Sequence, residues 1–167
     1  KESNAGGTAA KMLAKLGIKA LIVEGLPKED KWYSVHVTKN AITIQEESEL
    51  VGKGNYCLIN NVQARYGLPV AVMAIGPVSE MKMLSANISV ADPESRIRSL
   101  GRGGLGAVMG SKKIKFISID DSGTPPVMPK ETVKFKEAAR GFAKTLIDHP
   151  GSGQGLPTYG ANLLVNI

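Results

Sequence analysis

The stretch that decides the fold reads G-R-G-G-L-G-A-V-M-G-S-K-K-I-K and occupies residues 101–115 of a 167-residue chain. Five of its first ten residues are glycines, which lack a Cβ atom and leave the main chain open to close approach. Exposed main-chain N–H groups can form a concave anion site, and Arg102 adds a permanently charged group that suits phosphate or carboxylate. The stretch therefore predicts a loop that holds a large anion, followed by a short helix over 107–109 and a half-buried strand over 114–119.

Two phosphate-binding motifs can be compared with this loop. Residues 101–106 satisfy the dinucleotide fingerprint G-x-G-x-x-G, and Asp120 lies near the position of its ribose-binding acid. That fingerprint also needs a buried parallel strand before it and a full helix after it, whereas residues 94–100 are mostly polar. The P-loop is excluded because serine precedes lysine at 111–112. A Rossmann-like nucleotide-binding module, a glycine-rich turn without a ligand and a non-catalytic interaction domain remain as alternatives.

A second glycine loop lies near the start of the chain, at Asn4-Ala5-Gly6-Gly7. A predicted helix over 8–16 and a predicted apolar strand over 20–24 follow it. The same order of loop, helix and strand recurs over residues 103–119. Because an internal repeat places equivalent loops in equivalent positions, we expect the two glycine loops to lie side by side and to share one ligand.

The remaining pattern predicts the fold class. Alternating apolar residues indicate a hairpin with strands over 32–38 and 41–45, in which His36 would face solvent. This hairpin and the scarcity of long crossover helices predict an α+β fold with largely antiparallel sheets and an internal duplication. Cys57, on a predicted helix, is expected to be structural. The other expected elements are helices over 55–66 and 129–146, strands over 70–75 and 83–90, and a polar loop over 92–100.

Glycine and proline content predicts the domain organisation. Residues 1–150 are expected to form one domain, whereas residues 151–160 contain four glycines and a proline and predict a linker. The apolar residues that follow, up to residue 167, would begin a further domain. The chain starts at Lys1, directly in a motif, so we expect a fragment whose first domain is truncated at its N-terminus.

Composition narrows the class of protein. The net charge is +6, but the lysines are spread along the chain and no basic stretch alternates with aromatic residues, so we expect no nucleic-acid partner. No apolar run approaches the roughly 18 residues of a membrane span, and no signal peptide is visible. Cys57 is the single cysteine, so a cysteine-held iron–sulfur cluster cannot be built from this sequence alone. We therefore expect a cytoplasmic protein without membrane partners.

Three separated motifs resemble, in the same order, the N-terminal domain of the aldehyde ferredoxin oxidoreductase family, the tungstopterin enzymes. They are residues 4–7 with the strand region 16–25, the glycine stretch 101–115, and residues 155–160 with Leu164-Val165-Asn166-Ile167. The resemblance covers nearly the whole chain, and residues 28–100 match more loosely. It implies that a duplicated α+β base carries a tungsten or molybdenum bis-pterin cofactor.

The resemblance also implies an activity and partners. The family oxidises aldehydes to carboxylic acids with ferredoxin as electron acceptor, and its [4Fe–4S] cluster would be ligated outside these residues. The remaining domains of the same enzyme would be partners, and a homodimer is one assembly that the resemblance allows. No catalytic residue and no metal ligand is assigned within the chain, and the isolated fragment is expected to be inactive toward aldehydes.

The motif match assigns cofactor contacts to seven residues. Asn4, Ala5 and Gly6 would contact one pterin. Arg102, Gly103, Gly104 and Gly106 would contact the other pterin or its phosphate, with glycines giving clearance and N–H donors. Arg102 would then face open space rather than a structural carboxylate.

Overall fold

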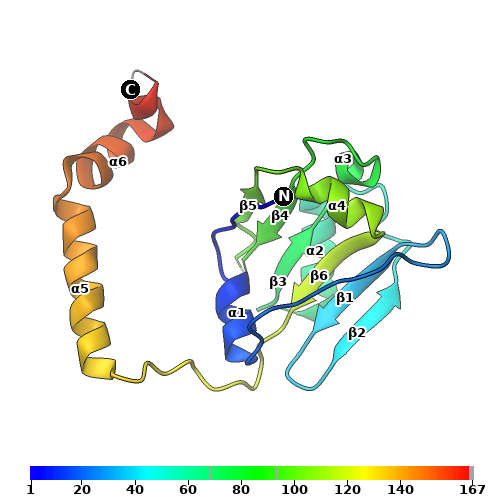
Figure 1. Cartoon of the computed structure of the whole chain (residues 1–167), viewed down its shortest axis with the longest axis horizontal. Helices are drawn as coiled ribbons and strands as arrows, with labels where there is room; N and C mark the ends of the chain where they lie inside the picture. The colour runs from blue at the N-terminus through cyan, green and yellow to red at the C-terminus, as the bar shows by residue number, and fades with distance from the viewer. Residues whose placement is uncertain (68, 93, 166–167) are drawn as a thin grey trace. The chain divides into compact units, whose positions relative to one another are not determined.

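The computed structural model describes residues 1–67, 69–92 and 94–165. The chain divides into two compact units, Lys1–Pro126 and Val127–Ile167 (Figure 1). This division falls earlier in the chain than residue 150, where glycine content places the predicted boundary. Within the described residues, no helix is both long and apolar enough to cross a membrane.

A six-stranded sheet forms the centre of the first unit (Figure 1). Its strand order is β2-β1-β6-β3-β4-β5, and among the described strands only β1 and β6 run parallel to each other. The expected α+β fold with a largely antiparallel sheet is therefore confirmed. The strands are β1 (Tyr33–Val37), β2 (Ile42–Glu46), β3 (Ala71–Ala74), β4 (Ile88–Ala91), β5 (Ile97–Leu100) and β6 (Ile114–Ile119).

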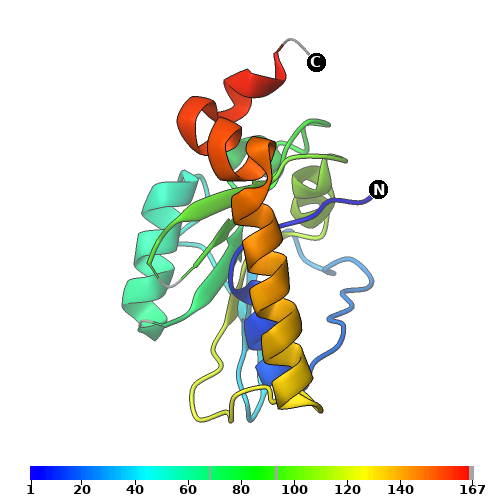
Figure 2. The same ribbon diagram turned by 90° about the vertical axis from the view of Figure 1, so that its left-hand side faces the viewer.

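Helices cover both faces of this sheet. On one face, α1 (Ala9–Lys15) and α4 (Leu105–Ser111) contribute Met12 and Met109 to a core that includes Ile117. On the other face, α2 (Asn55–Tyr66) packs Leu58 and Val62 against β3 and β6. Figure 2 shows α2 on one side of the sheet and α4 on the other. A short helix, α3 (Pro77–Glu80), packs against α4 at one end of the sheet.

Strand β6 departs from its sequence prediction, because all six of its residues are buried rather than every second one. Lys115 is fully buried, and its ammonium group donates hydrogen bonds to the carbonyl oxygens of Ile75 (2.7 Å) and Lys53 (3.3 Å) and to the Glu80 carboxylate. Glu80 also accepts from the main-chain N–H of Gly52 at 3.0 Å. A charged residue is therefore tolerated inside because three oxygens accept its protons.

Several local elements agree with the sequence pattern. The hairpin β1–β2 turns at Lys39-Asn40, with Thr38 N–H bonded to the Ala41 carbonyl oxygen. Helix α2 begins at Asn55 and ends at Tyr66, as predicted, and Gly67 follows it with φ of 83°. The strand predicted over 70–75 is β3, and the helix predicted after the glycine stretch is α4.

Other elements differ from the prediction. Residues 92–100 contain β5, an edge strand rather than a loop, because it pairs with β4 and packs Leu100 into one core and Ile97 against the other. The strand predicted over 83–90 begins only at Ile88. The strand predicted over 20–24 is not formed, so the repeat of loop and helix lacks its first strand.

Two single residues also differ. His36 is half-buried, because its ring stacks on Tyr66 at 4.0 Å between centroids and its Nδ1 lies 2.7 Å from Ser118 Oγ. Burial lowers the pKa of His36, although the negative charge of Asp120 opposes this. Cys57 is exposed on α2 instead of being part of the core. Ser118 is fully buried, so its pairing with His36 is structural.

The second unit is helical. Its main element is α5 (Thr132–Asp148), which ends where His149 Nδ1 accepts from the main-chain N–H groups of Gly151 and Ser152. A π-helical turn (Pro150–Gly155), α6 (Leu156–Tyr159) and a 3₁₀ turn (Gly160–Leu164) follow, so the predicted linker is wound into helical turns. No residue of these four elements is buried. Asn166 and Ile167, the end of the third motif, lie outside the described residues.

Candidate functional site

The N-terminal segment and the glycine stretch lie side by side and border a hollow of about 640 Å³. The N–H group of Arg102 lies 3.4 Å from Ser3 Oγ, which joins residues that are 99 positions apart. The walls of the hollow are Glu2, Ser3, Asn4, Gly101 and Arg102. Residues 2–4 thus meet residues 101–102, but the hollow is lined by neither the Gly6-Gly7 pair nor the Gly103-Gly104 pair, so the expected shared surface of the two glycine loops stays a prediction.

The first glycine loop rests on an arginine of β5. A Cβ atom on Gly6 would lie 3.1 Å from Arg98 Cδ, and Gly7 adopts a φ of 105° beside the same side chain. Arg98 is held in turn by Asp92, with 3.0 Å between Nη1 and Oδ2. The bare α-carbons of this loop therefore give clearance to an arginine side chain of the protein itself.

The Asp92 carboxylate pairs with two arginines, Arg98 in β5 and Arg96 just before this strand. It lies 2.9 Å from Arg96 Nε and accepts the Arg96 main-chain N–H at 2.9 Å. Burial alone raises the pKa of Asp92, but the Arg96 main-chain N–H and the guanidinium groups of Arg98 and Arg96 outweigh it and lower the pKa to about 2. Arg98 and Arg96 thus share a carboxylate that stays ionised at neutral pH, and Glu94 gives Arg96 a second carboxylate at 3.0 Å.

Arg102 differs from these neighbours. Its side chain is exposed at the wall of the hollow, and no carboxylate of the described residues forms an ion pair with it. A guanidinium in such a position offers several N–H donors in one plane to an anion. The hollow is therefore lined by one cationic side chain, Arg102, and one acidic residue, Glu2, and the described structure shows no ion pair for Arg102.

The seven predicted contact residues divide into two groups. Asn4, Ala5, Gly6, Arg102 and Gly103 are exposed, whereas Gly104 and Gly106 are buried. The exposed group lies on or next to the hollow, while the buried pair lies under it at the start of α4.

The glycines of α4 are needed for packing inside the protein. A Cβ atom on Gly104 would come closer than 3.0 Å to the Leu84 carbonyl oxygen. A Cβ atom on Gly106 or Gly110 would overlap in the same way with the main chain of Asn87 or of Ser79. The clearance predicted for a ligand at Gly104 and Gly106 is therefore filled by the chain itself.

The predicted donor role of Gly106 also needs correction. Its N–H group donates to the Ala86 carbonyl oxygen at 2.9 Å, so it is not available to a ligand. Gly101, by contrast, has no atom within 4 Å of the position of a Cβ atom, and it borders the hollow. Gly103 has less free space than Gly101 and more than Gly106, because its Cβ position is 2.7 Å from the Glu2 carbonyl oxygen.

Sequence reasoning did not select Glu2, Ser3 and Gly101 as wall residues, nor Arg98 as the support of the first loop. Glu2, Ser3 and Arg98 carry no motif, and their roles depend on how the start of the chain crosses the end of β5. Gly101 could have been found, since it opens the glycine stretch. No group of three or more His, Cys, Asp or Glu side chains in the described part of the chain could hold a metal ion.

The topology also tests the Rossmann alternative. A dinucleotide fold requires the strand before the glycine fingerprint to be parallel to its neighbours. Strand β5 precedes the fingerprint here and is antiparallel to β4. The Rossmann-like reading is therefore wrong. Fold and site together define an α+β domain with a surface hollow that is bordered by the start of the glycine stretch and by the exposed Arg102.

Comparison with known proteins names the family. The family profile described as "Aldehyde ferredoxin oxidoreductase, N-terminal domain" matches residues 1–121. The chain is 34% identical over 166 residues to the tungsten-containing aldehyde ferredoxin oxidoreductase of Pyrococcus furiosus and 32% identical over 170 residues to that of Thermococcus kodakarensis. Each match covers 99% of this chain and 26% of the relative. The chain belongs to the aldehyde ferredoxin oxidoreductase family and spans about a quarter of the length of these relatives.

A solved structure shows the same fold. It is the active site complex BamBC of benzoyl-coenzyme A reductase in complex with 1,5-dienoyl-CoA, and it superimposes with a TM-score of 0.75 at 24% identity. The match covers 86% of this chain and 21% of the other. At this level of identity the similarity concerns the fold alone.

Proposed function

We propose that this chain is part of an aldehyde:ferredoxin oxidoreductase and binds one side of a tungsten bis-pterin cofactor, or of its molybdenum counterpart. The observation that carries the proposal is the exposed guanidinium of Arg102 in a hollow between the start of the chain and the glycine stretch. The family and the tungsten-containing relatives support the choice of ligand. The longer enzyme would oxidise aldehydes to carboxylic acids and pass electrons to ferredoxin.

The residues present fit such a cofactor. Arg102 would form charge-assisted hydrogen bonds with a phosphate or another anionic group, and its planar shape favours two parallel bonds. Asn4 presents an exposed amide that can donate and accept at the facing wall. Gly101 gives clearance, because nothing occupies its Cβ position. When bound, the metal would supply the two-electron redox chemistry, while this chain binds the cofactor and holds it in place.

Other parts of the enzyme would complete the active centre. Cys57 is the single cysteine of the chain, so at least three of the four thiolates of a [4Fe–4S] cluster would come from elsewhere. The aldehyde pocket, the ferredoxin surface and any dimer contact are likewise expected outside these residues. We propose the cytoplasm as the compartment, since a reduced cysteine and a low-potential electron partner suit it.

The test is to replace Arg102 in the full-length enzyme that contains this chain. Each charge-assisted hydrogen bond contributes about 1.5–3 kcal/mol, so Arg102→Gln is expected to weaken cofactor binding by roughly ten- to a hundredfold. The cofactor affinity of Arg102→Lys should lie between that of the parent and that of Arg102→Gln, because lysine keeps the charge but loses the planar pair of donors. Tungsten and pterin per polypeptide, measured after dilution or dialysis, report the loss without relying on activity.

The matched control is Arg140→Gln, which removes an exposed arginine from α5. It should leave the tungsten and pterin content unchanged. Full cofactor content in Arg102→Gln, with a folded protein by circular dichroism, would contradict the proposal.

A further inference from the structure

The last residue of the glycine-rich stretch, Lys115, forms a buried ion pair that takes no part in the proposed cofactor contacts. Lys115 is fully buried in β6, and its partner Glu80 is the last residue of α3. The Lys115 ammonium also donates to the Ile75 carbonyl oxygen at 2.7 Å. Both carboxylate oxygens of Glu80 accept from the Gly52 N–H group, at 3.0 and 3.1 Å. The pair therefore joins the centre of the sheet to the end of α3 and to the β2–α2 loop.

A buried ion pair of this kind is a weak source of stability. Two charges must leave water, and apolar side chains of similar volume often give an equally stable protein. The ion pair differs from apolar packing in its direction, because an ammonium group satisfies its acceptor oxygens in only one arrangement. The elements that the pair joins are therefore held more closely in place than apolar packing alone would hold them.

The segment that carries the carboxylate of this pair, residues 79–87, lies against α4. Carbonyl oxygens of the segment come so close to Gly104, Gly106 and Gly110 that a Cβ atom on any of them would overlap. The Gly106 N–H group donates to the Ala86 carbonyl oxygen at 2.9 Å. A shift of residues 79–87 would therefore shift α4 from its start onward.

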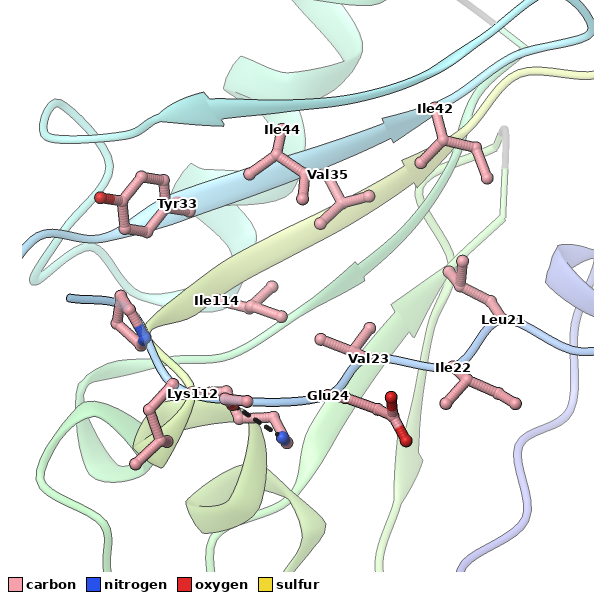
Figure 3. Close-up of a pocket in the computed structure, with 13 residues that line it drawn as sticks. Leu21, Ile22, Val23, Glu24, Tyr33, Val35, Ile42, Ile44, Lys112 and Ile114 are labelled. Atoms are coloured by element: carbon pink, nitrogen blue, oxygen red, sulfur yellow. Dashed lines mark hydrogen bonds between the residues drawn. The ribbon is translucent and has the colours of Figure 1, made fainter.

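The other end of α4 is held by a different lysine. Lys112, at the C-cap of α4, donates from Nζ to the Gly25 carbonyl oxygen at 3.0 Å, the hydrogen bond that Figure 3 shows as a dashed line. This contact fixes the C-terminal end of the helix. The N-terminal end, which follows Arg102, depends on residues 79–87 instead.

We propose that Lys115 and Glu80 are positioning residues for the cofactor hollow, a role that rests on the proposed function. The pair fixes residues 79–87, these residues fix the start of α4, and the start of α4 holds Arg102 at the wall of the hollow. Neither Lys115 nor Glu80 would touch the cofactor. Loss of the pair would let Arg102 move away from the anion, which would weaken binding although the charge of the hollow is unchanged.

Amide hydrogen exchange in the full-length enzyme tests the first part of this proposal. The variant is Lys115→Met with Glu80→Gln, because removing both charges leaves neither of them unpaired in the core. The reporter is the Gly106 amide, and the reference is the Asp120 amide, which bonds to the Val37 carbonyl oxygen at 2.9 Å. The ratio of the Gly106 rate to the Asp120 rate should rise by at least about tenfold, since hydrogen bonds to charged groups are lost. An unchanged ratio would overturn the proposal.

Two controls separate this local effect from general destabilisation. Leu58→Ala removes a fully buried side chain of α2 and should lower the melting temperature at least as much as the double variant. Lys112→Met removes the lysine hydrogen bond at the other end of α4. Neither control should raise the Gly106 to Asp120 ratio, and an equal rise in Leu58→Ala would mean that the pair acts only through overall stability.

Cofactor retention tests the second part. Tungsten and pterin per polypeptide after dialysis should be about tenfold lower in the double variant than in Leu58→Ala, because a displaced Arg102 loses charge-assisted hydrogen bonds. A pair that only stabilises the fold predicts the opposite order, since Leu58→Ala is the less stable protein. Equal retention in the two variants would overturn the positioning role.

Arg102→Gln distinguishes this inference from the proposed function. Full cofactor content in Arg102→Gln would refute the proposed function. Loss of cofactor from Arg102→Gln, with full content in the double variant, would refute the positioning role alone. If the double variant does not fold, Glu80→Gln replaces it, since glutamine keeps the volume and an acceptor oxygen. Its Gly106 to Asp120 ratio should also rise, and an unchanged ratio there would equally count against the proposal.

Discussion

The glycine stretch allows a direct test of what its glycines do. The structure separates Gly101, whose Cβ position is open to the hollow, from Gly106 and Gly110, whose Cβ positions overlap with main-chain atoms of residues 79–87. We therefore predict that Gly106→Ala and Gly110→Ala destabilise the first unit, whereas Gly101→Ala leaves its stability unchanged. The quantity to measure is the free energy of unfolding, because this energy depends on packing inside the protein and can be measured without the cofactor.

The magnitude follows from two opposing contributions. Alanine at position 110, inside α4, gains about 1 kcal/mol of helix propensity over glycine. Against this, the new methyl group must displace the Ser79 carbonyl oxygen, and overpacking against a main chain that cannot rotate away costs about 3 kcal/mol. The expected net loss is about 2 kcal/mol, or a fall in melting temperature of roughly 6 °C for a unit of this size. Gly101→Ala should lie within about 0.5 kcal/mol of the parent.

The assay is thermal and urea unfolding of the 167-residue chain, followed by circular dichroism. In the full-length enzyme the order should reverse for cofactor content: Gly101→Ala should lower tungsten and pterin per polypeptide, because its methyl group enters the hollow. If Gly106→Ala and Gly110→Ala were as stable as the parent, α4 would not pack on residues 79–87 as described. The assignment of these glycines to internal packing would then be refuted.

Three further predictions concern charges and activity. Lys115→Met should lower the free energy of unfolding in urea by about 3 kcal/mol, because the mostly buried Glu80 loses its partner. The double variant Lys115→Met with Glu80→Gln should lose less stability. Equal losses in the two variants would contradict a buried ion pair. Asp92 has a pKa lowered to about 2, so the stability that it contributes should be complete above about pH 4 and disappear as the pH falls toward 2. Asp92→Asn should flatten acid unfolding in that window, and an unchanged profile would contradict the assignment. The isolated chain should not reduce dyes with aldehydes, since we propose that the cluster ligands lie outside it; activity of cofactor-free protein would contradict this.

Elements with a local cause could be predicted from the sequence. Helix α2 has an apolar face and is followed by a glycine with positive φ, and both features can be read within 13 residues. The β1–β2 hairpin has alternation on both sides of a two-residue turn. In both elements the residues that interact are close together in the chain, so the local sequence pattern is enough to predict the element.

Elements with distant partners could not be predicted in the same way. Lys115 stands at an alternating position that is typical of a solvent-facing residue, yet its acceptors come from residues 53, 75 and 80. Residues 20–24 have the composition of a buried strand, yet in the described structure they form no strand and pair with none. The sequence marks Gly104 and Gly106 as close-approach positions, but it does not show that residues 79–87 provide the atoms that come close to them.

The same reasoning separates two arginines that look equivalent in the sequence. Arg98 and Arg102 are four residues apart, the first within β5 and the second in the glycine stretch. Arg98 supports the Gly6 loop and shares its charge with Asp92, whereas Arg102 lines the hollow without a carboxylate among the described residues. An anion in the hollow therefore meets the charge of Arg102, while Arg98 fixes the position of the facing loop. Replacing Arg98 should misplace that loop even where the charge is kept, as in Arg98→Lys, because the planar bond to Asp92 would be lost. A cofactor that touches both walls requires both arginines. Arg102 would supply the charge, and Arg98 would hold the Gly6 loop in place.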